Sequence, residues 1–328
     1  RGKIMTTKQK VHEFISKYML SIILVVLIIC ISFANRSFLT ANNILNILRT
    51  MSMKGIVAFG MTFVIIAGEI DLSIGSTIGL SGVIVGVVAG NLSSAGTMSL
   101  EATTWVGILV AIIVGILIGL FDGFLLTKFN MPSFIITLGM MKLIYGIAAV
   151  LAKGFPVTTL GSWYTELGAG NAGIIPIPAI FLAAVFIISF VLLKYTGFGR
   201  NVYAVGGNAE AARLSGINVK ATRVLIMVIV QVCAVIAGVL VSSQVMSGSF
   251  SFGSGWEMTV ISAVIIGGAS LSGGKGKITG TLLGLAFLGV IQNAMTLMGV
   301  DNYIQYIVEG ALVLIAVLFN TLQTRKSE

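Results

Sequence analysis

A glycine- and lysine-rich run, Gly-Gly-Lys-Gly-Lys at residues 273–277, has the composition of a phosphate-binding loop. A Walker A loop needs a glycine, four further residues, and then Gly-Lys followed by a Ser or Thr whose hydroxyl binds Mg²⁺. Here Ala269 occupies the first glycine position and Gly276 the hydroxyl position, and both flanks are apolar spans. We therefore expect this chain not to bind ATP, and we interpret Lys275 and Lys277 as cytoplasmic anchors.

The residues needed for metal binding or nucleophilic catalysis are also missing from the sequence. His12 is the single histidine, so no Ser/His/Asp arrangement has its general base inside the chain. The two cysteines, Cys30 and Cys233, both lie in apolar runs, where a thiol behaves as a small hydrophobe. We expect no metal site, no cofactor in this chain and no enzymatic activity.

Ionisable residues lie at membrane depth, where they are costly and suggest a function. They are Glu69, Asp71, Asp122, Lys142, Glu257 and Glu309. Glu69 and Asp71 are placed at a cytoplasmic turn from which both can reach the interface, and a structural or gating role is favoured for them. For Lys142 with Asp122 or Glu309, a buried ion pair is favoured over a substrate site.

Polar and aromatic side chains inside apolar runs are candidates for lining a pathway. A neutral polyhydroxyl solute needs hydrogen-bond partners and an aromatic face more than fixed charge. The candidates are Gln231, Gln244, Trp256, Gln292 and Asn293. Hydrogen bonds between helices explain each of these residues equally well, so both interpretations stay open.

The composition requires that these residues be carried by membrane helices. Hydrophobic residues make up 57% of the 328 residues and charged residues 9%, against about 25% charged in a soluble domain. We predict an all-α integral membrane protein, one domain over residues 1–328, with about ten spans in one bundle. The predicted spans are residues 18–34, 53–68, 72–90, 105–127, 133–151, 175–195, 222–243, 257–271, 277–298 and 304–321. Two of them, 53–68 and 257–271, are short for a core of about 30 Å, and short glycine-interrupted segments often line a pathway.

The distribution of basic residues predicts the orientation of the spans. With both termini in the cytoplasm, fifteen of the twenty Lys and Arg residues fall on the inner side, as the positive-inside rule requires. The net charge of +9 is explained in this way, and no basic stripe with interleaved aromatics indicates nucleic-acid binding. Residues 35–54 fit less well, and their alternating polar and apolar pattern leaves an interfacial helix or a re-entrant piece open.

Small residues predict where the helices approach closely. Glycines recur every four residues at 82–90, 115–123 and 276–284, a spacing that favours tight helix packing in lipid. Residues 64–75 and 264–274 look alike, which makes an internal repeat possible, although two short apolar matches also arise by chance.

The polar stretch Asn208–Gly216 between two spans predicts a short helix. Asn208 is a good N-cap, Glu210 lies in the first turn, and Gly216 is a natural stop after Ala211, Ala212 and Arg213. About two turns of helix are marginal in water, so a cytoplasmic partner is one interpretation and a solvated loop helix is the other.

Three segments of the chain together resemble one family. They are Gly-Glu-Ile-Asp-Leu-Ser-Ile-Gly at 68–75, the cytoplasmic segment 199–218, and Ile-Gly-Gly-Ala-Ser-Leu-Ser-Gly-Gly-Lys-Gly at 266–276. In this order, over nearly the whole chain, they closely resemble the permease subunits of bacterial monosaccharide ABC importers. Glu210-Ala211-Ala212 followed by Gly216 is similar to the EAA loop of such permeases, although no proline follows Gly216.

The resemblance implies a homodimeric permease of the bacterial inner membrane that imports ribose or a related monosaccharide by alternating access. It implies a separate ATPase subunit, which carries ATP and Mg²⁺ and docks on a coupling loop at about residues 196–221, through Glu210, Ala211, Ala212, Arg213 and Gly216. It also implies an external sugar-binding protein and contact with membrane lipid. Glu69 and Asp71 remain gating candidates.

Two other functions stay open on the residues alone. An ion-coupled secondary sugar transporter would use Glu309, Lys142 and Asp122 as an ion relay without an ATPase. A passive sugar channel would need neither ATP nor an ion gradient. Neither alternative explains the polar loop that contains Glu210.

Overall fold

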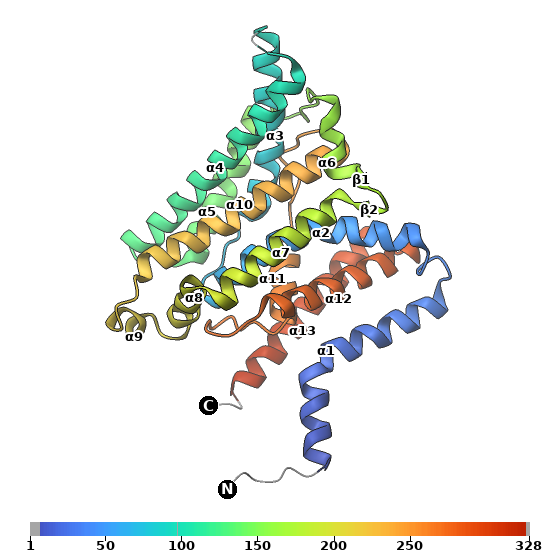
Figure 1. The fold of residues 1–328 in the computed structure, drawn as a ribbon, viewed down its shortest axis with the longest axis vertical. Coiled ribbons are helices and arrows are strands. Elements are labelled where there is room, and N and C mark those ends of the chain that lie inside the picture. The colour runs from blue at the N-terminus through green and yellow to red at the C-terminus, as the bar shows by residue number, and fades with distance from the viewer. Residues whose placement is uncertain (1–6, 97, 326–328) are drawn as a thin grey trace.

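The structure, a computed structural model that describes residues 7–96 and 98–325, is built almost entirely from helices (Figure 1). They are α1 Thr7–Ala34, α2 Ala41–Ile66, α3 Ile74–Ser94, α4 Leu100–Lys128, α5 Ser133–Leu151, α6 Thr165–Ala169, α7 Ile177–Tyr195, α8 Gly197–Gly207, α9 Ala209–Leu214, α10 Val219–Val245, α11 Trp256–Ile266, α12 Ile278–Leu297 and α13 Asn302–Arg325. A short ribbon pairs β1, Asn171–Ala172, with β2, Ile175–Pro176. The predicted all-α membrane fold is confirmed.

Helix α2 forms the centre of the bundle, and α3 is buried to the same extent. For both helices, 78% of the most apolar 18-residue window is buried, against 28% for α5 and for α7. Helices α7, α10, α11 and α12 all contact α2, while α4, α5 and α10 contact α3. The little-buried spans α4, α5 and α7 are more apolar than α2 and α3, as expected for helices whose solvent is lipid.

Each predicted span coincides with a helix. Seven helices are long and apolar enough to cross a membrane: α2, α3, α4, α5, α7, α10 and α12. Apolar stretches of 10–17 residues occur in the remaining three, α1, α11 and α13. Helix α11 has 11 residues, or about 16 Å, which is half of a hydrocarbon core of about 30 Å. The prediction that this span is short is confirmed.

The prediction that the span at residues 53–68 is also short is wrong. Residues 35–54 do not form a separate interfacial or re-entrant piece, because α2 runs without a break from Ala41 to Ile66. Two of its polar side chains have partners far away in the chain. Asn43 exchanges hydrogen bonds with Asn293 at 2.9 Å, and Arg49 donates to Asn171 at 2.8 Å. These contacts tie the first half of α2 to α12 and to β1.

The glycine spacings have two different outcomes. On α4, Gly119 and Gly123 lie directly against the backbone of α10, as predicted for close helix packing. On α3, Gly82 lies against Ser242 of α10, as predicted, but Gly86 and Gly90 face Val157 and Thr159. The prediction of a helix partner is therefore wrong for Gly86 and Gly90, which are covered by the non-helical segment that follows α5.

The two similar segments, residues 64–75 and 264–274, contain the ends of α2 and α11, and these two helices end in the same way. Gly68 and Gly268 both have positive φ angles, 81° and 91°. The amides after α2 bond back to Ile65 and Val64, and those after α11 bond back to Ile265 and Val264. The positive φ favours glycine at both positions.

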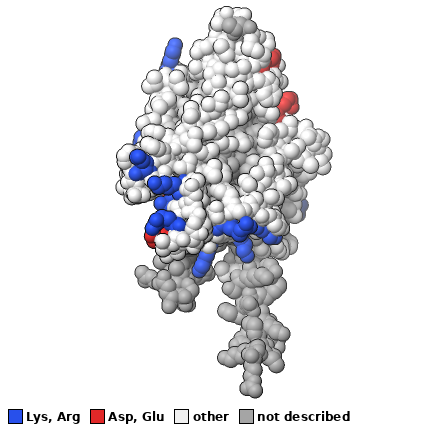
Figure 2. Space-filling model, turned by 60° about the vertical axis from the view of Figure 1, so that its left-hand side comes forward, with Lys and Arg blue, Asp and Glu red and all other residues white. Residues whose placement is uncertain are grey.

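The two ends of the bundle differ in charge. Helices α8 and α9 lie at one end, at the lower left in Figure 1, while α6, β1 and β2 lie at the other. In Figure 2, Lys and Arg side chains gather along the lower edge of the visible face, and that face is otherwise largely uncharged. Arg1, Lys3 and Lys326, which were assigned to the cytoplasmic side, lie outside the described residues.

Candidate functional site

Helix α9 has the geometry predicted for it. The Asn208 side chain accepts a hydrogen bond from the Ala211 amide at 2.9 Å, which caps the helix. Gly216 has φ 84°, and the amides of Gly216 and Ile217 bond back to Arg213 and Ala212, each at 3.0 Å. This is a complete Schellman motif, so both ends of the helix are specified locally.

The outer surface of α9 combines charge with an exposed apolar side chain. Glu210 and Arg213 form an exposed ion pair at 2.6 Å, in which Arg213 lowers the pKa of the Glu210 carboxyl through a hydrogen bond and its charge. Leu214 is 75% exposed, whereas Ala212 is buried. A surface ion pair is worth little stability by itself, so these groups are free to contact a partner.

Helix α8, which the sequence analysis did not predict, connects α9 to the bundle. Thr196 caps it, and Val202 and Val205 are buried. Gly206 lies so close to the carbonyl of Ile66 that a Cβ there would overlap it. The end of α2 is thus held directly beneath α8.

The loop between α11 and α12 also contacts the end of α2 and helix α8. The Gly274 amide donates to the Ile66 carbonyl at 2.8 Å, and the Tyr203 hydroxyl of α8 donates to the Gly276 carbonyl at 2.8 Å. Helix α8, which leads directly into α9, thus contacts both the end of α2 and the loop that follows α11.

Asp71 lies in a fully buried network and does not reach the interface. Its carboxylate accepts hydrogen bonds from the amide and hydroxyl of Ser73 at 2.8 and 2.7 Å, and from the Gln231 amide at 2.8 Å. Gln231 in turn accepts from Thr77 at 2.6 Å. The network joins the first turn of α3 to α10, so Asp71 and Gln231 hold helices together.

Glu69 is also buried, and it forms an ion pair with Arg223 of α10 at 3.0 Å. The expectation that Glu69 and Asp71 both reach the interface is therefore wrong. Both residues lie in the break between α2 and α3, and both connect that break to α10.

The predicted ion pair of Lys142 with Asp122 or Glu309 is absent from the described residues, whose ion pairs are Glu210–Arg213 and Glu69–Arg223. Asp122 is fully buried on α4, and neither of its oxygens accepts a hydrogen bond. Lys142 is exposed on α5. Helices α4 and α5 contact each other, yet Asp122 is buried and Lys142 is exposed, so the two side chains do not pair.

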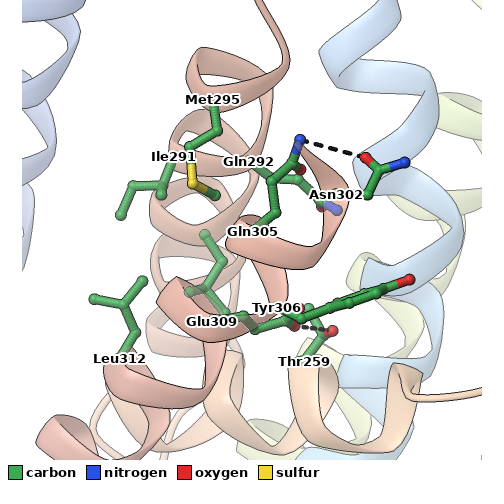
Figure 3. Close-up of a pocket in the computed structure, with 10 residues that line it drawn as sticks. Thr259, Ile291, Gln292, Met295, Asn302, Gln305, Tyr306, Glu309 and Leu312 are labelled. Atoms are coloured by element: carbon green, nitrogen blue, oxygen red, sulfur yellow. Dashed lines mark hydrogen bonds between the residues drawn. The ribbon is translucent and has the colours of Figure 1, made fainter. Parts of the chain in front are cut away.

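Two cavities flank the beginning of α11. The first, the α13 cavity, has a volume of about 190 Å³ and is lined by Thr259, Leu288, Ile291, Gln292, Met295, Asn302, Gln305, Tyr306, Glu309 and Leu312 (Figure 3). Glu309 accepts a hydrogen bond from Thr259, and Gln305 donates to Asn302 at 3.4 Å. Amide, hydroxyl and carboxylate groups converge here with the Tyr306 ring.

Lys54 connects the α13 cavity to Trp256 at the start of α11. Its ammonium donates to Gln292 at 3.0 Å and lies 5.5 Å from the centre of the Trp256 ring. The predicted residues Trp256 and Gln292 are thus connected through Lys54 of α2.

The second, the α5 cavity, has a volume of about 400 Å³ and is lined by Gly75, Ser76, Met141, Lys142, Tyr145, Phe250, Phe252, Ser254 and Glu257. Tyr145 packs edge-on against Phe250 at 5.4 Å. Hydroxyl groups, two charged groups and aromatic faces are the groups that bind a polyhydroxyl solute. The sequence analysis singled out Glu257 and Glu309 because they are ionisable residues at membrane depth. Nothing in the sequence distinguished the aromatic residues that line the two cavities.

The remaining pathway candidates lie elsewhere. Asn293 is paired with Asn43, and Gln244 lies in neither cavity, with its backbone against Gly168. Among the described residues, no group of three His, Cys, Asp or Glu side chains is placed to hold a metal ion. The polar groups around the start of α11 are therefore suited to binding a solute by hydrogen bonds.

The chain has clear relatives. The family described as branched-chain amino acid transport system / permease component matches residues 43–317. The ribose import permease protein RbsC of Bacillus subtilis is 42% identical over 299 residues, which cover 90% of both chains. RbsC of Haemophilus influenzae is 37% identical over 326 residues, or 98% of both chains. The L-arabinose transport system permease protein AraH of Escherichia coli is 36% identical over 304 residues, covering 93% of this chain and 90% of AraH. No solved structure matches the chain.

Proposed function

Because this chain belongs to the family of branched-chain amino acid transport system / permease components, we propose that it is the sugar-importing permease subunit of an ATP-driven transporter. The observation that carries the proposal is the identity of 37–42% to ribose import permeases along almost the full chain. Ribose or a related monosaccharide is the proposed substrate. The chain is a multi-pass protein of the bacterial inner membrane, and ATP hydrolysis belongs to a partner subunit.

The proposed architecture is one domain over residues 1–328 with ten crossings and both termini in the cytoplasm. The seven long helices and three shorter apolar stretches supply ten segments in the required order. Helices α8 and α9, within the proposed coupling loop at residues 196–221, then lie on the cytoplasmic side. The basic side chains along the lower edge in Figure 2 support this orientation.

The ATPase subunit docks on α9 in this proposal. Glu210→Lys reverses the charge of the exposed pair, and Gly216→Glu forces a side chain into a backbone at φ 84°. Both variants are expected to insert normally but to lose the ATPase on purification in mild detergent, with at least a tenfold loss of uptake. Ser215→Ala, which removes only a hydroxyl on the same exposed turn, is the control. Wild-type uptake by both variants would rule out docking at α9.

The sugar passes by the two cavities at the start of α11, delivered to the outer face by a sugar-binding protein. Discontinuous helices in transporters commonly end at the substrate site, and α11 begins after the non-helical residues 246–255. Lys142 lines the α5 cavity together with Glu257, so its charge faces this polar lining and not hydrocarbon. Alternating access then moves the opening from one side of these cavities to the other.

Gln292→Ala tests this pathway. Loss of one hydrogen-bonding group in the α13 cavity is expected to raise the KM for sugar uptake about fivefold, while the amount of permease in the membrane stays constant. Gln244→Ala, a glutamine outside both cavities, should leave KM unchanged. Equal effects of the two substitutions, or none from either, would contradict the pathway.

The energy source is tested separately. An ion-coupled transporter is favoured by a single observation, the buried Asp122 carboxyl without a hydrogen-bond partner. Uptake is measured after the ion gradient is collapsed while ATP is maintained. Continued uptake is expected for the ATP-driven importer, and its loss would favour ion coupling.

A further inference from the structure

A third cavity lies at the end of the bundle that carries α8. It has a volume of about 550 Å³ and is formed by the last turns of α7, the side of α8 and the beginning of α12. Its lining consists of Phe190, Leu193, Lys194, Arg200, Tyr203, Lys277, Ile278 and Thr279. Three of these residues are basic and none is acidic. We call it the basic cavity.

The three basic groups have no carboxylate partner among the described residues, where ion pairs form only at Glu210–Arg213 and Glu69–Arg223. Lys194 is instead held over two rings, with its ammonium 5.0 Å from the centres of both Phe190 and Tyr195. This places a positive charge at the last turn of the apolar helix α7. The site therefore has unneutralised charge at a membrane boundary.

The beginning of α12 adds to the positive potential. Lys277 is its N-cap residue and makes no side-chain cap, so the first amides of this 20-residue helix are left without a capping acceptor. Anions bind favourably at such an end because of the exposed N–H groups and the helix dipole. Thr279, in the first turn, lines the cavity and offers a hydroxyl.

One wall of the basic cavity is apolar and continues towards the span. Leu193 and Ile278 are buried, while Phe190 lies one turn deeper into α7. On the same helix Ile187 and Val191 are exposed, which is the character of a surface covered by hydrocarbon. Helices α7 and α12 contact α2, whereas α5 contacts α3 and α4. The cavity thus opens on a different face from α5.

We propose that the basic cavity binds the phosphate headgroup of an anionic phospholipid of the inner leaflet, with an acyl chain along Phe190 and Leu193. Basic pockets between helices on the cytoplasmic side are suited to such headgroups. The charge, the helix end and the apolar wall each match a different part of the lipid. A free phosphate would use the first two features but not the third.

The test is native mass spectrometry of the full-length permease, purified in mild detergent and titrated with phosphatidylglycerol. The Lys194→Gln/Lys277→Gln variant is expected to bind about 30-fold more weakly, because each basic residue near an anionic surface contributes a factor of about five. The control, Lys128→Gln/Lys220→Gln, removes two exposed lysines outside the cavity and should bind as wild type does. Retained folding of both variants is checked by their thermal unfolding.

Three further arms distinguish the ligand. Phosphatidylcholine with the same acyl chains should bind weakly, and equal binding would overturn the assignment to an anionic lipid. Inorganic phosphate should not displace the lipid at equal concentration, and displacement would assign the cavity to a free anion. Loss of the lipid when the ATPase subunit joins the permease would show that the cavity belongs to that subunit, and would overturn the proposal. The lipid proposal does not depend on the identity of the sugar.

Discussion

Gly206→Ala is expected to abolish coupled sugar uptake while the permease remains in the membrane. A Cβ at this position overlaps the Ile66 carbonyl and lies 2.7 Å from the Gly274 amide, so α8 must move away from the ends of α2 and of the loop before α12. Both neighbours are backbone atoms that cannot rotate aside. We expect uptake to fall more than tenfold, because the contact that carries movement from α9 into the bundle is lost.

The neighbouring glycine supplies a matched control. Gly207 is also in the last turn of α8, and a Cβ there meets no atom within 4 Å. Gly207→Ala should therefore retain wild-type uptake. In reconstituted transporter, Gly206→Ala should keep basal ATP hydrolysis but lose its stimulation by the loaded sugar-binding protein. Equal stimulation in the two variants would show that coupling does not pass through this contact.

Asp71→Ala is expected to have the largest effect on stability. The carboxylate accepts three hydrogen bonds at full burial, so its removal leaves buried donors of Ser73 and Gln231 without an acceptor. Each unsatisfied buried group costs about 1–3 kcal/mol, so we expect a loss of about 3 kcal/mol or more in the free energy of unfolding. Thermal unfolding of the purified chain in detergent measures the change.

Asparagine at the same position separates hydrogen bonding from charge. Asp71→Asn keeps an acceptor for Ser73 but turns a donor towards Gln231, so about half of the loss is expected. Asp301→Asn, an exposed carboxylate that bonds the Tyr303 amide, is the control and should change the melting temperature little. A melting temperature of Asp71→Ala equal to that of the wild type would contradict a structural role for the network.

Features specified by neighbouring residues could be predicted from the sequence. The cap at Asn208 and the stop at Gly216 are local, so α9 was located correctly although it has only six residues. The apolar runs likewise located a helix at every predicted span, because lipid exposure selects for long apolar segments. The close packing of α4 could also be predicted, because it depends on a glycine spacing within that helix.

Features that depend on distant partners could not be predicted. The first half of α2 is tied to the rest of the bundle by Asn43, Arg49 and Lys54, which are paired with residues that lie more than 100 positions away in the chain. The same holds for Asp71 and Gln231, which are joined across 160 positions. Helix α8 was missed because its glycines disfavour a helix, and only packing against Ile66 and Gly274 explains them.

The half-length of α11 constrains how the chain is made. The insertion machinery recognises a segment mainly by its length and hydropathy, and 11 residues after the polar, glycine-rich stretch 246–255 do not meet that requirement. This stretch reaches the membrane interior only by lying against Gly75 and Gly79 of α3. We therefore expect α11 to insert late, after α3 is in place and together with α12, which it contacts.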